Sequence, residues 1–517
     1  MGVDKSKQKK NLLKKNYKEC FIYYFDDKIW YITNQHLKKV NHIIDGSIKL
    51  EESQAYMHRY KKVGGDSLFK MILGSGTIDN YSNFGNTNKV IIVFDLPYRP
   101  LIKDIDLTRS YNKNAKLFKH VNDKHFPLYV DERTKKLNYY LKRSKKNEKE
   151  KVILRGKIKK NKTSTKVKYK NIVEADKLKL IGIMRMISEN KNNIKELGEE
   201  IKRYPVEVWK DGKGVFENRL KVYEYLTKKF KALNNPNLVM DGAVAEGSNE
   251  FSSIELHSNI KTPGSQIGEG ELGIMFYIKT KGYKNVFIHS TDTDTFTIAG
   301  LYYAIEGLGI DQNIFMRCKN WYYRKNGIGD NSNRIYIVDV KKLSNRLKSD
   351  FSNLEYPLLT FWVFWGILLG CDFISGVHKL IQINQRDITI DETLKNIFNR
   401  LRRTKSKIIN LVRVENDKFL DDTYFSVELN IPEVFNLIKS CTPKKFKKKD
   451  RVQFNSICLN TNYVANYMIN QYRIKDPIER RHIIPKCDLR DEEGFSVFGY
   501  EEKNGKMFQS QNVKQYI

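Results

Sequence analysis

The stretch Val90-Ile91-Ile92-Val93-Phe94-Asp95 is a fully apolar run that ends in an aspartate. Because its apolar residues are continuous and do not alternate with polar ones, it is typical of a strand buried on both faces, as in a parallel sheet. His42-Ile43-Ile44-Asp45 has the same form, and Val286 to Ile288 is a third such run. The three runs predict an α/β fold with a central, mostly parallel sheet flanked by helices.

Acidic residues follow all three predicted strands. Asp45 and Asp95 come directly after the first two, and Asp292 and Asp294 lie a few residues beyond the third. In an open α/β sheet, ligands bind in the crevice outside the carboxyl ends of the strands. We therefore expect these aspartates to meet at one edge of the sheet, although they are far apart in the sequence.

The chain is strongly basic. Its 517 residues include 93 Lys and Arg against 60 Asp and Glu, which gives a formal net charge of +33. Such a charge attracts polyanions, so nucleic acid is the expected partner. An AT-biased genome, such as that of a large DNA virus, is a second explanation for the Lys- and Asn-rich composition. With 40% hydrophobic residues the chain can bury a large core, and its length corresponds to about two to four domains.

The six cysteines are scattered without a Cys-x-x-Cys pair, which favours a reducing intracellular compartment and gives no zinc-binding pattern. The first residues are basic and polar and do not resemble a secretory signal. The run Tyr356 to Ile374 is almost uncharged and nearly long enough to span a bilayer. Because it contains Pro357, Gly366 and Gly370 and carries Asp372 near its end, we expect a buried helix that leads into a site, and no membrane span.

Changes in composition divide the chain. Arg133 to Lys170 is dense in Lys and Arg, and we interpret it either as a solvated linker or as a mobile cationic element over the site. Asn234 to Gln266 carries Gly, Ser and Asn without helical periodicity, which predicts a loop. The basic stretch Lys444 to Arg451 is either a nuclear-targeting signal or solvated charge. The predicted regions are a first part of the core at 1–110, a basic, arch-like insertion at 111–265, a second part of the core at 266–385 and a C-terminal region of unknown role at 386–517.

Gly268-Glu269-Gly270-Glu271 is the sharpest local motif. Ile274 and Met275 follow at helical spacing, so the two glutamates are predicted at the start of a helix. Acidic residues at a helix N-terminus also interact favourably with the helix dipole, and this structural role is the alternative for each glutamate alone. The order of the motifs favours a joint role, because His289 to Asp294 and then Gly370 to Phe373 follow.

Together these motifs supply seven carboxylates. Two divalent cations about 4 Å apart need several hard oxygen ligands, since the ions and the carboxylates neutralise one another. Two Mg²⁺ ions, which Mn²⁺ can replace, would activate water and stabilise the leaving oxygen of a phosphodiester, with no covalent enzyme intermediate. The predicted metal ligands are Asp45, Asp95, Glu269, Glu271, Asp292, Asp294 and Asp372.

The chain resembles the flap-endonuclease (XPG-like) family of 5′ nucleases in the order and form of these motifs. The resemblance covers roughly Met1 to Ser110 and Gln266 to Gln385, in separate islands, and Leu96 replaces the glycine that the family has after the second strand. The matching stretches are Met1-Gly2-Val3, Ile44-Asp45-Gly46-Ser47, Val93-Phe94-Asp95, Glu269-Gly270-Glu271, Asp292-Thr293-Asp294 and Gly370-Cys371-Asp372-Phe373.

The resemblance implies a PIN-like nuclease core and a structure-specific, two-metal 5′ nuclease that cuts branched or flapped DNA in replication, repair or recombination. It also implies a division of the ligands: one metal mainly on Asp45, Asp95 and Glu271, the other on Asp292, Asp294 and Asp372, with Glu269 close by, directly or through water. The expected enzyme is a monomer that works on nucleic acid and not at a membrane, in the nucleus or a viral DNA replication compartment.

Two cations after the second strand match residues with which the family steadies the scissile phosphate. The resemblance assigns this catalytic role to Lys103 and Arg109. Arginine offers a planar fork to a phosphate, whereas lysine supplies a mobile point charge. The alternative for both residues is that they are surface cations.

Several features depart from the family pattern. The segment between the islands is longer than a typical helical arch, and Gly376 to Lys379 is only a fragment of the expected duplex-binding helix-two-turn-helix. The last residues, Lys514 to Ile517, form no recognisable sliding-clamp motif. Asp26 and Asp27 follow another apolar run and compete with Asp45 as the ligand of the first strand, although Gly46-Ser47 and the spacing to Asp95 favour Asp45.

Three rival functions share the same motifs. Gly268 to Met275 also resembles the corresponding motif of a 5′-to-3′ exoribonuclease, and a viral messenger-RNA endonuclease on the same core is a further alternative. From a different class, the chain could be a catalytically inactive scaffold that binds nucleic acid. The motifs alone do not separate DNA from RNA as the substrate, nor endonuclease from exonuclease activity.

Overall fold

The computed structural model describes residues 2–25, 40–47, 89–96, 223–248, 251–255, 261–262, 265, 267–290, 292–319, 334–374, 376–381, 390–403, 408–416, 424–476, 479–480, 485–503 and 506–517. All seven predicted metal ligands belong to these ranges. Lys103, Arg109, Asp26, Asp27 and the stretch Arg133 to Lys170 lie outside the described residues, so the roles predicted for them stay predictions.

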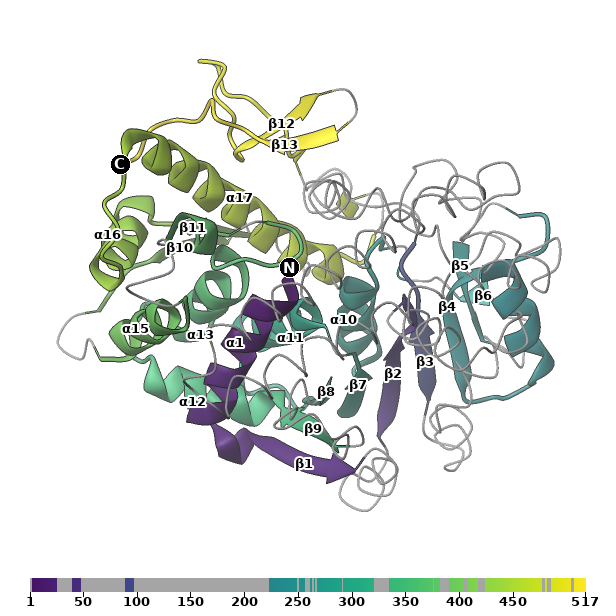
Figure 1. The fold of residues 1–517 in the computed structure, drawn as a ribbon. Coiled ribbons are helices and arrows are strands. Elements are labelled where there is room, and N and C mark those ends of the chain that lie inside the picture. The colour runs from purple at the N-terminus through teal and green to yellow at the C-terminus, as the bar shows by residue number, and fades with distance from the viewer. Residues whose placement is uncertain are drawn as a thin grey trace, which may run out of the picture.

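A central sheet of nine described strands organises the molecule, in the order β1-β9-β8-β7-β2-β3-β4-β5-β6 (Figure 1). The strands are β1 (Phe21–Phe25), β2 (Asn41–Asp45), β3 (Val90–Val93), β4 (Leu238–Val244), β5 (Phe251–Glu255), β6 (Lys261–Thr262), β7 (Asn285–His289), β8 (Asn313–Lys319) and β9 (Arg334–Asp339).

The five middle strands, β8, β7, β2, β3 and β4, run parallel, and the flanking strands are antiparallel. The three strands predicted from apolar runs are β2, β3 and β7, and they are neighbours. Their register pairs Ile43 with Ile91 and with Ile288, and these side chains are at most 1% exposed. The prediction of an α/β fold with a mostly parallel central sheet is therefore confirmed.

The loop predicted for Asn234 to Gln266 is wrong, because this segment contains β4, β5 and β6. β4 pairs with β3, so the segment extends the central sheet. Its sequence, Leu238-Val-Met-Asp-Gly-Ala-Val244, is apolar except for Asp241-Gly242. Gly242 instead has φ 88° at a register shift within the β4–β5 pair, so the strand continues through a bulge.

Helices cover both faces of the sheet. On one face, α10 (Gly270–Lys281) lies over β2 and β3, α11 (Thr293–Glu306) packs beside it, and α12 (Val340–Asp350) contacts β8 and β9. On the other face, a helix over 223–232 packs the Tyr223 ring on Phe94 and hydrogen-bonds Met240 of β4 through Thr227. This arrangement of helices over a mostly parallel sheet is compatible with a Rossmann-like layout.

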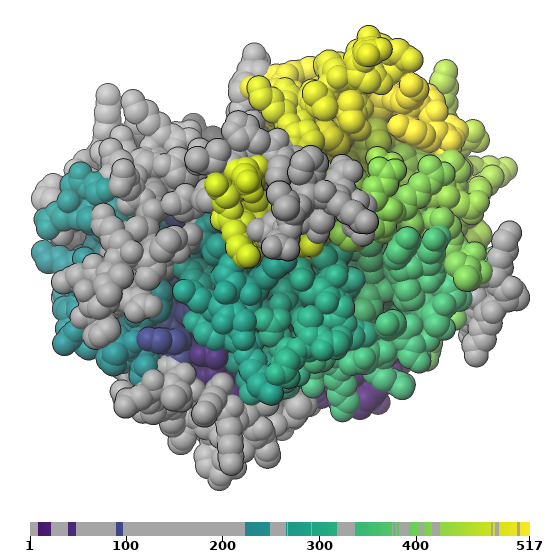
Figure 2. Space-filling view, turned by 180° about the vertical axis from the view of Figure 1, so that it is seen from behind, coloured from purple at the N-terminus to yellow at the C-terminus, as the bar shows by residue number. Residues whose placement is uncertain are grey.

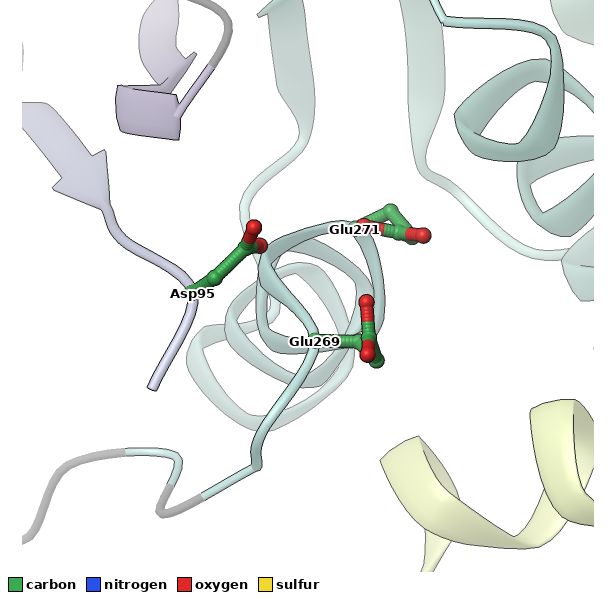
Figure 3. Close-up of side chains that lie close together, drawn as sticks. All are labelled: Asp95, Glu269 and Glu271. Carbon is green, nitrogen blue, oxygen red and sulfur yellow. The ribbon is translucent and has the colours of Figure 1, made fainter. Parts of the chain in front are cut away.

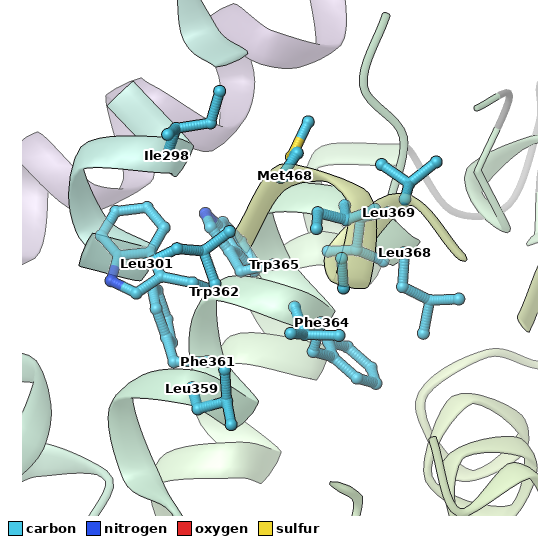
Figure 4. Packing of buried hydrophobic residues seen from close by; sticks show 14 of the residues in the cluster. Ile298, Leu301, Leu359, Phe361, Trp362, Phe364, Trp365, Leu368, Leu369 and Met468 are labelled. Atoms are coloured by element: carbon cyan, nitrogen blue, oxygen red, sulfur yellow. The ribbon is translucent and has the colours of Figure 1, made fainter. Parts of the chain in front are cut away.

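The apolar run Tyr356 to Ile374 forms α13 (Pro357–Phe361) and the π-helix η6 (Trp362–Leu368), as the prediction of a buried helix requires. Trp362 and Trp365 are 1% exposed, and Figure 4 shows them packed among Ile298, Leu301 and Met468. None of the helices that the structure describes has the length and apolar character needed to cross a membrane.

Glycines bring α11 against η6. A Cβ at Gly300 would overlap the Trp362 ring, and a Cβ at Gly366 would overlap Thr297. The backbones therefore approach more closely than any residue with a side chain would permit. Because α11 starts just after Asp292 and η6 ends just before Asp372, this contact sets the distance between two of the predicted acidic motifs.

The C-terminal region packs directly on the core, as the continuous green and yellow surface in Figure 2 shows. Its long helix α17 (Lys448–Arg473) contacts α10, α11 and η6. The remaining elements are α1 (Gly2–Asn16), the 3₁₀ helix η1 (Lys18–Cys20), α14 (His378–Ile381), α15 (Ile390–Arg403), β10 (Val412–Asn416), β11 (Phe425–Leu429), α16 (Ile431–Cys441), α17 (Lys448–Arg473), β12 (Tyr500–Lys503) and β13 (Lys506–Gln509).

A row of asparagines joins α17 to the hairpin β10–β11. Asn462, Asn466 and Asn470 are four residues apart, so they share one face of the helix. Their amide oxygens accept hydrogen bonds from the backbone N–H groups of Leu429, Val427 and Phe425, at 2.7–2.9 Å. Asn466 and Asn470 also donate to the carbonyls of Val427 and Phe425. These side chains occupy the edge of β11 that β10 leaves open.

Candidate metal centre

Three carboxylates meet at the first turn of α10. The ligand oxygens of Asp95, Glu269 and Glu271 all lie within 4.8 Å of one another. Figure 3 shows Asp95 on the segment after β3, beside the helix turn that carries both glutamates. Glu269 and Glu271 are 2% and 6% exposed. Among the described residues, no other three His, Cys, Asp or Glu side chains bring ligand atoms this close together.

The backbone explains why this group forms. Leu96 N donates to Gly268 O at 2.8 Å, and Gly270 N donates to Asp95 Oδ1 at 2.7 Å, so the end of β3 is bound to the start of α10. A Cβ at Gly270 would lie 2.8 Å from Asp95 Oδ1, which only a glycine avoids. The glycine of the Gly-Glu-Gly-Glu motif thus permits the contact that brings its glutamates to Asp95.

Asp45 belongs to a second hydrogen-bonded group, with Asp292. Ser290, just after β7, donates its hydroxyl to Asp45 Oδ2 at 3.0 Å and accepts from the backbone N–H of Asp292 at 3.2 Å. Its oxygen also lies 3.0 Å from Thr295 Oγ1. Ser290 therefore connects the ends of β2 and β7 and fixes the chain where α11 begins.

Asp292 and Asp294 define the start of α11, and Asp294 reaches the loop after η6. Asp292 Oδ1 accepts from Asp294 N at 3.1 Å, which caps the helix. Asp294 is 2% exposed, and its Oδ2 accepts from the backbone N–H of Asp372 at 3.0 Å. Asp372 itself is exposed. The backbone of the third motif is thereby attached to the carboxylate of the second.

Ser47 connects the two groups. Its hydroxyl oxygen accepts from the backbone N–H of Asp95 at 3.2 Å, and it lies two residues after Asp45. Gly46, between Asp45 and Ser47, lies so close to the Phe94 ring that a Cβ on Gly46 would be 2.5 Å from it. The hydrogen bond from Asp95 to Ser47 and the segment Asp45–Ser47 therefore connect the compact group to Asp45 and, through Ser290, to Asp292, Asp294 and Asp372.

Asp241 is a buried carboxylate that is not among the seven predicted ligands. It pairs in register with Val93 of β3, which in turn pairs with Asp45, so the three side chains lie in one row on the α10 face of the sheet. Ser265 donates to Asp241 Oδ2 at 2.7 Å. Burial raises the pKa of Asp241 to about 6, although hydrogen bonds from Ser265 and other donors oppose the rise.

The segment before Glu269 is further held by Arg480, which is 3% exposed. Arg480 donates to Ser265 O at 2.9 Å and to Ile474 O, just after α17. Its guanidinium also lies over the Phe276 ring of α10. A residue of the C-terminal region therefore supports the chain that leads into the acidic turn.

A pair of buried histidines lies behind Asp45. His42 Nδ1 and His289 Nε2 are 3.1 Å apart on the neighbouring strands β2 and β7. In the register of these strands their side chains fall on the face opposite to Asp45. Burial lowers the pKa of His42 to about 3, so the ring is neutral near pH 7. His42 therefore adds no charge behind the site.

The structure thus brings the seven predicted ligands to the carboxyl ends of β2, β3 and β7 in two linked groups. The compact group is Asp95, Glu269 and Glu271, and Asp45 accepts a hydrogen bond from Ser290. The division of the ligands between two metals stays a prediction. The residues that the prediction missed are Ser47, Ser290, Asp241, Ser265 and Lys9 of α1, whose ammonium group donates to Gly370 O, two residues before Asp372.

The signal for four of these residues was present in part. Ser47 and Ser290 stand inside the quoted motifs, and Asp241 ends an apolar run just as Asp45 and Asp95 do. Ser265 lies close before the glutamate motif. Nothing in the sequence distinguishes Lys9, a buried lysine, from the other lysines of the N-terminal segment.

The class that this fold defines is a mixed α/β protein with a mostly parallel central sheet and an acidic site at the carboxyl ends of its strands. No protein-family model and no curated protein matches the sequence.

Proposed function

We propose that the protein is a metal-dependent, structure-specific 5′ nuclease with a PIN-like core, which hydrolyses phosphodiester bonds in branched DNA. The observation that carries the proposal is the linked pair of carboxylate groups at one edge of the sheet, in a chain with a net charge of +33. Hard carboxylate oxygens in such number suit Mg²⁺ or Mn²⁺.

The residues divide into ligands and supports. Asp95, Glu269 and Glu271 have the geometry to hold one divalent cation, and Asp292, Asp294 and Asp372 are candidates for a second. Bound divalent cations would supply an activated water and stabilise the leaving oxygen of the phosphodiester. Ser47 and Ser290 keep the carboxylates in place through hydrogen bonds, because ligands need such partners to hold their orientation.

The positive charge of the rest of the chain supports nucleic acid as the substrate. Phosphate contacts release counterions, so affinity for DNA should fall steeply between about 50 and 200 mM salt. An exposed group on α17 and just before it, Lys445, Lys447, Lys448, Lys449 and Arg451, adds to this charge. Such an enzyme would act where DNA is replicated, in a nucleus or a viral replication compartment.

The test is cleavage of labelled 5′-flap, nicked, blunt and single-stranded DNA, and of matched RNAs, with Mg²⁺, with Mn²⁺ or with EDTA. We expect metal-dependent cutting of flapped DNA by the wild type. Glu271→Gln should still bind the flap and not cut it. Asp311→Asn is the matched control, because Asp311 is an exposed acid paired with Lys284. Asp311 lies just before the parallel strand β8, at the end of the sheet opposite to the acidic site.

The outcomes separate the rival functions. Cutting of single-stranded RNA from the 5′ end, with no cutting of flaps, would favour the exoribonuclease. Salt-sensitive binding without metal-dependent cutting on any substrate would favour the inactive scaffold. Equal cutting by the wild type and Glu271→Gln would exclude the acidic turn of α10 as the catalytic centre.

A further inference from the structure

Lys9 of α1 is buried at the end of the π-helix η6. The residue is 3% exposed, and its Nζ donates to three backbone carbonyls: Trp365 O at 2.9 Å, Gly366 O at 3.1 Å and Gly370 O at 2.8 Å. An ammonium group has three N–H donors, so all of them are used. The three acceptors lie at least 356 positions along the chain from Lys9.

Two of the carbonyls that Lys9 binds, those of Trp365 and Gly366, belong to the last turn of η6, and the third, that of Gly370, belongs to the loop that follows. The last carbonyls of any helix lack intrahelical N–H donors and need another group to satisfy them. A lysine side chain from elsewhere can do this and is favoured by the negative end of the helix dipole. Lys9 therefore acts as a cap supplied by a distant part of the chain.

The loop that follows η6 is tightly folded and carries Asp372. Gly370 and Gly376 both have positive φ, 113° and 63°, and a Cβ at Gly376 would overlap the backbone of Gly370. Cys371 N donates to Ile374 O at 3.3 Å, and Asp372 N donates to Asp294 Oδ2 at 3.0 Å. Lys9 binds the carbonyl of Gly370, two residues before Asp372.

We propose that Lys9 is a positioning residue, which holds the segment Gly370 to Ile374 so that Asp372 faces Asp294. The proposal builds on the nuclease function for its catalytic consequence, but the loop itself can be tested without any activity. The Lys9 ammonium group donates to backbone carbonyls of η6 and the loop. It therefore affects the site by holding Asp372 in place and not by touching a substrate.

Charge and geometry predict opposite effects of removing Lys9, which makes the proposal testable. Lys9 lies close enough to Asp294 and Asp372 for its charge to interact with both carboxylates. Loss of a nearby positive charge would by itself tighten the binding of a divalent cation to those acids. Weaker cation binding after its removal would therefore report the loss of positioning.

The experiment compares Lys9→Met, whose unbranched side chain is one atom shorter and has no donors, with Lys15→Met on the same helix, where Lys15 is exposed. We expect the Mn²⁺ concentration for half-maximal cleavage to rise about 10-fold in Lys9→Met, as is typical when a residue that orients a ligand is lost. Lys15→Met should behave as the wild type. Lys9→Gln, which keeps two donors without the charge, should lie between them.

Amide hydrogen exchange of Gly370 to Ile374, measured without metal or nucleic acid, distinguishes failure of this proposal from failure of the proposed function. Faster exchange in Lys9→Met than in Lys15→Met would support Lys9 as the support of the loop even if no nuclease activity exists. Unchanged exchange, or an unchanged or lower Mn²⁺ requirement in an active protein, would overturn it. If Lys9→Met does not fold, the same comparison is made with Lys9→Gln.

Discussion

The carboxylate of Asp95 accepts a 2.7 Å hydrogen bond from the backbone N–H of Gly270, 175 positions further along the chain. This contact gives Asp95 two separate roles, as a structural acceptor for the first turn of α10 and as a charged member of the acidic group. The two roles can be separated by mutation, because an asparagine keeps the acceptor oxygen and loses the charge.

We expect Asp95→Asn to lower the rate of metal-dependent cleavage by at least about 100-fold. This loss is larger than the loss usually caused by replacing a residue that only supports a metal ligand. Without metal, the variant should be as stable as the wild type or more stable by about 1 kcal/mol, because carboxylate repulsion falls. Asp95→Ala should instead lose stability. Urea unfolding in EDTA measures the difference, and equal destabilisation by both substitutions would contradict the structural role.

Ser290→Ala removes the hydroxyl that joins Asp45 to the start of α11. The loss of its buried hydrogen bonds should lower the free energy of unfolding by about 1–3 kcal/mol. The Mg²⁺ concentration for half-maximal cleavage should rise about 10-fold, as for other residues that orient ligands. Ser352→Ala, at an exposed position, is the control. If stability falls while the Mg²⁺ requirement stays constant, Ser290 stabilises the fold but does not orient the metal ligands.

Asp241→Asn should change how stability depends on pH. Because burial raises the pKa of Asp241 to about 6, above its ordinary value of 3.8, the unfolded chain releases this proton first. The stability contributed by the protonated form is fully present below about pH 4 and is lost as pH rises through 6. The variant should therefore gain about 2–3 kcal/mol over the wild type at pH 8 and match it near pH 4. A difference that does not vary with pH would contradict this assignment.

Gly300→Ala should destabilise the protein by about 1–3 kcal/mol, because the new methyl group must displace the buried Trp362 ring. Gly309→Ala is the matched control, since a Cβ there meets no atom within 4 Å. Urea unfolding checks both variants. Equal stability of the two would show that α11 and η6 can move apart without cost.

Much of the sheet could be predicted because its central strands carry the signal in their own sequence. The runs before Asp45 and Asp95 are continuous and apolar, which a strand buried on both faces requires. β4 escaped prediction because Asp241-Gly242 interrupts its run, and the sequence does not show whether such a pair forms a turn or a bulge. The strand forms because β4 pairs with β3 and β5, and the local sequence of β4 does not encode this pairing.

The site was predictable to a similar extent. Carboxylates at strand ends and at a helix start follow from the topology of an open sheet, so their convergence could be expected. Which acids make direct contact depends on hydrogen bonds between distant segments, such as Ser47 with Asp95. Lys9 could not be found, because its partners are backbone carbonyls more than 350 positions away and have no side-chain signature.

The asparagine row on α17 has a consequence for self-association. An open strand edge offers unpaired N–H and C=O groups that can recruit a strand from another molecule. Along Phe425–Leu429 these groups already bind Asn462, Asn466 and Asn470. The helix therefore shields the hairpin from intermolecular strand addition, and replacing the asparagines with leucines would leave a template for aggregation while the apolar packing stayed in place.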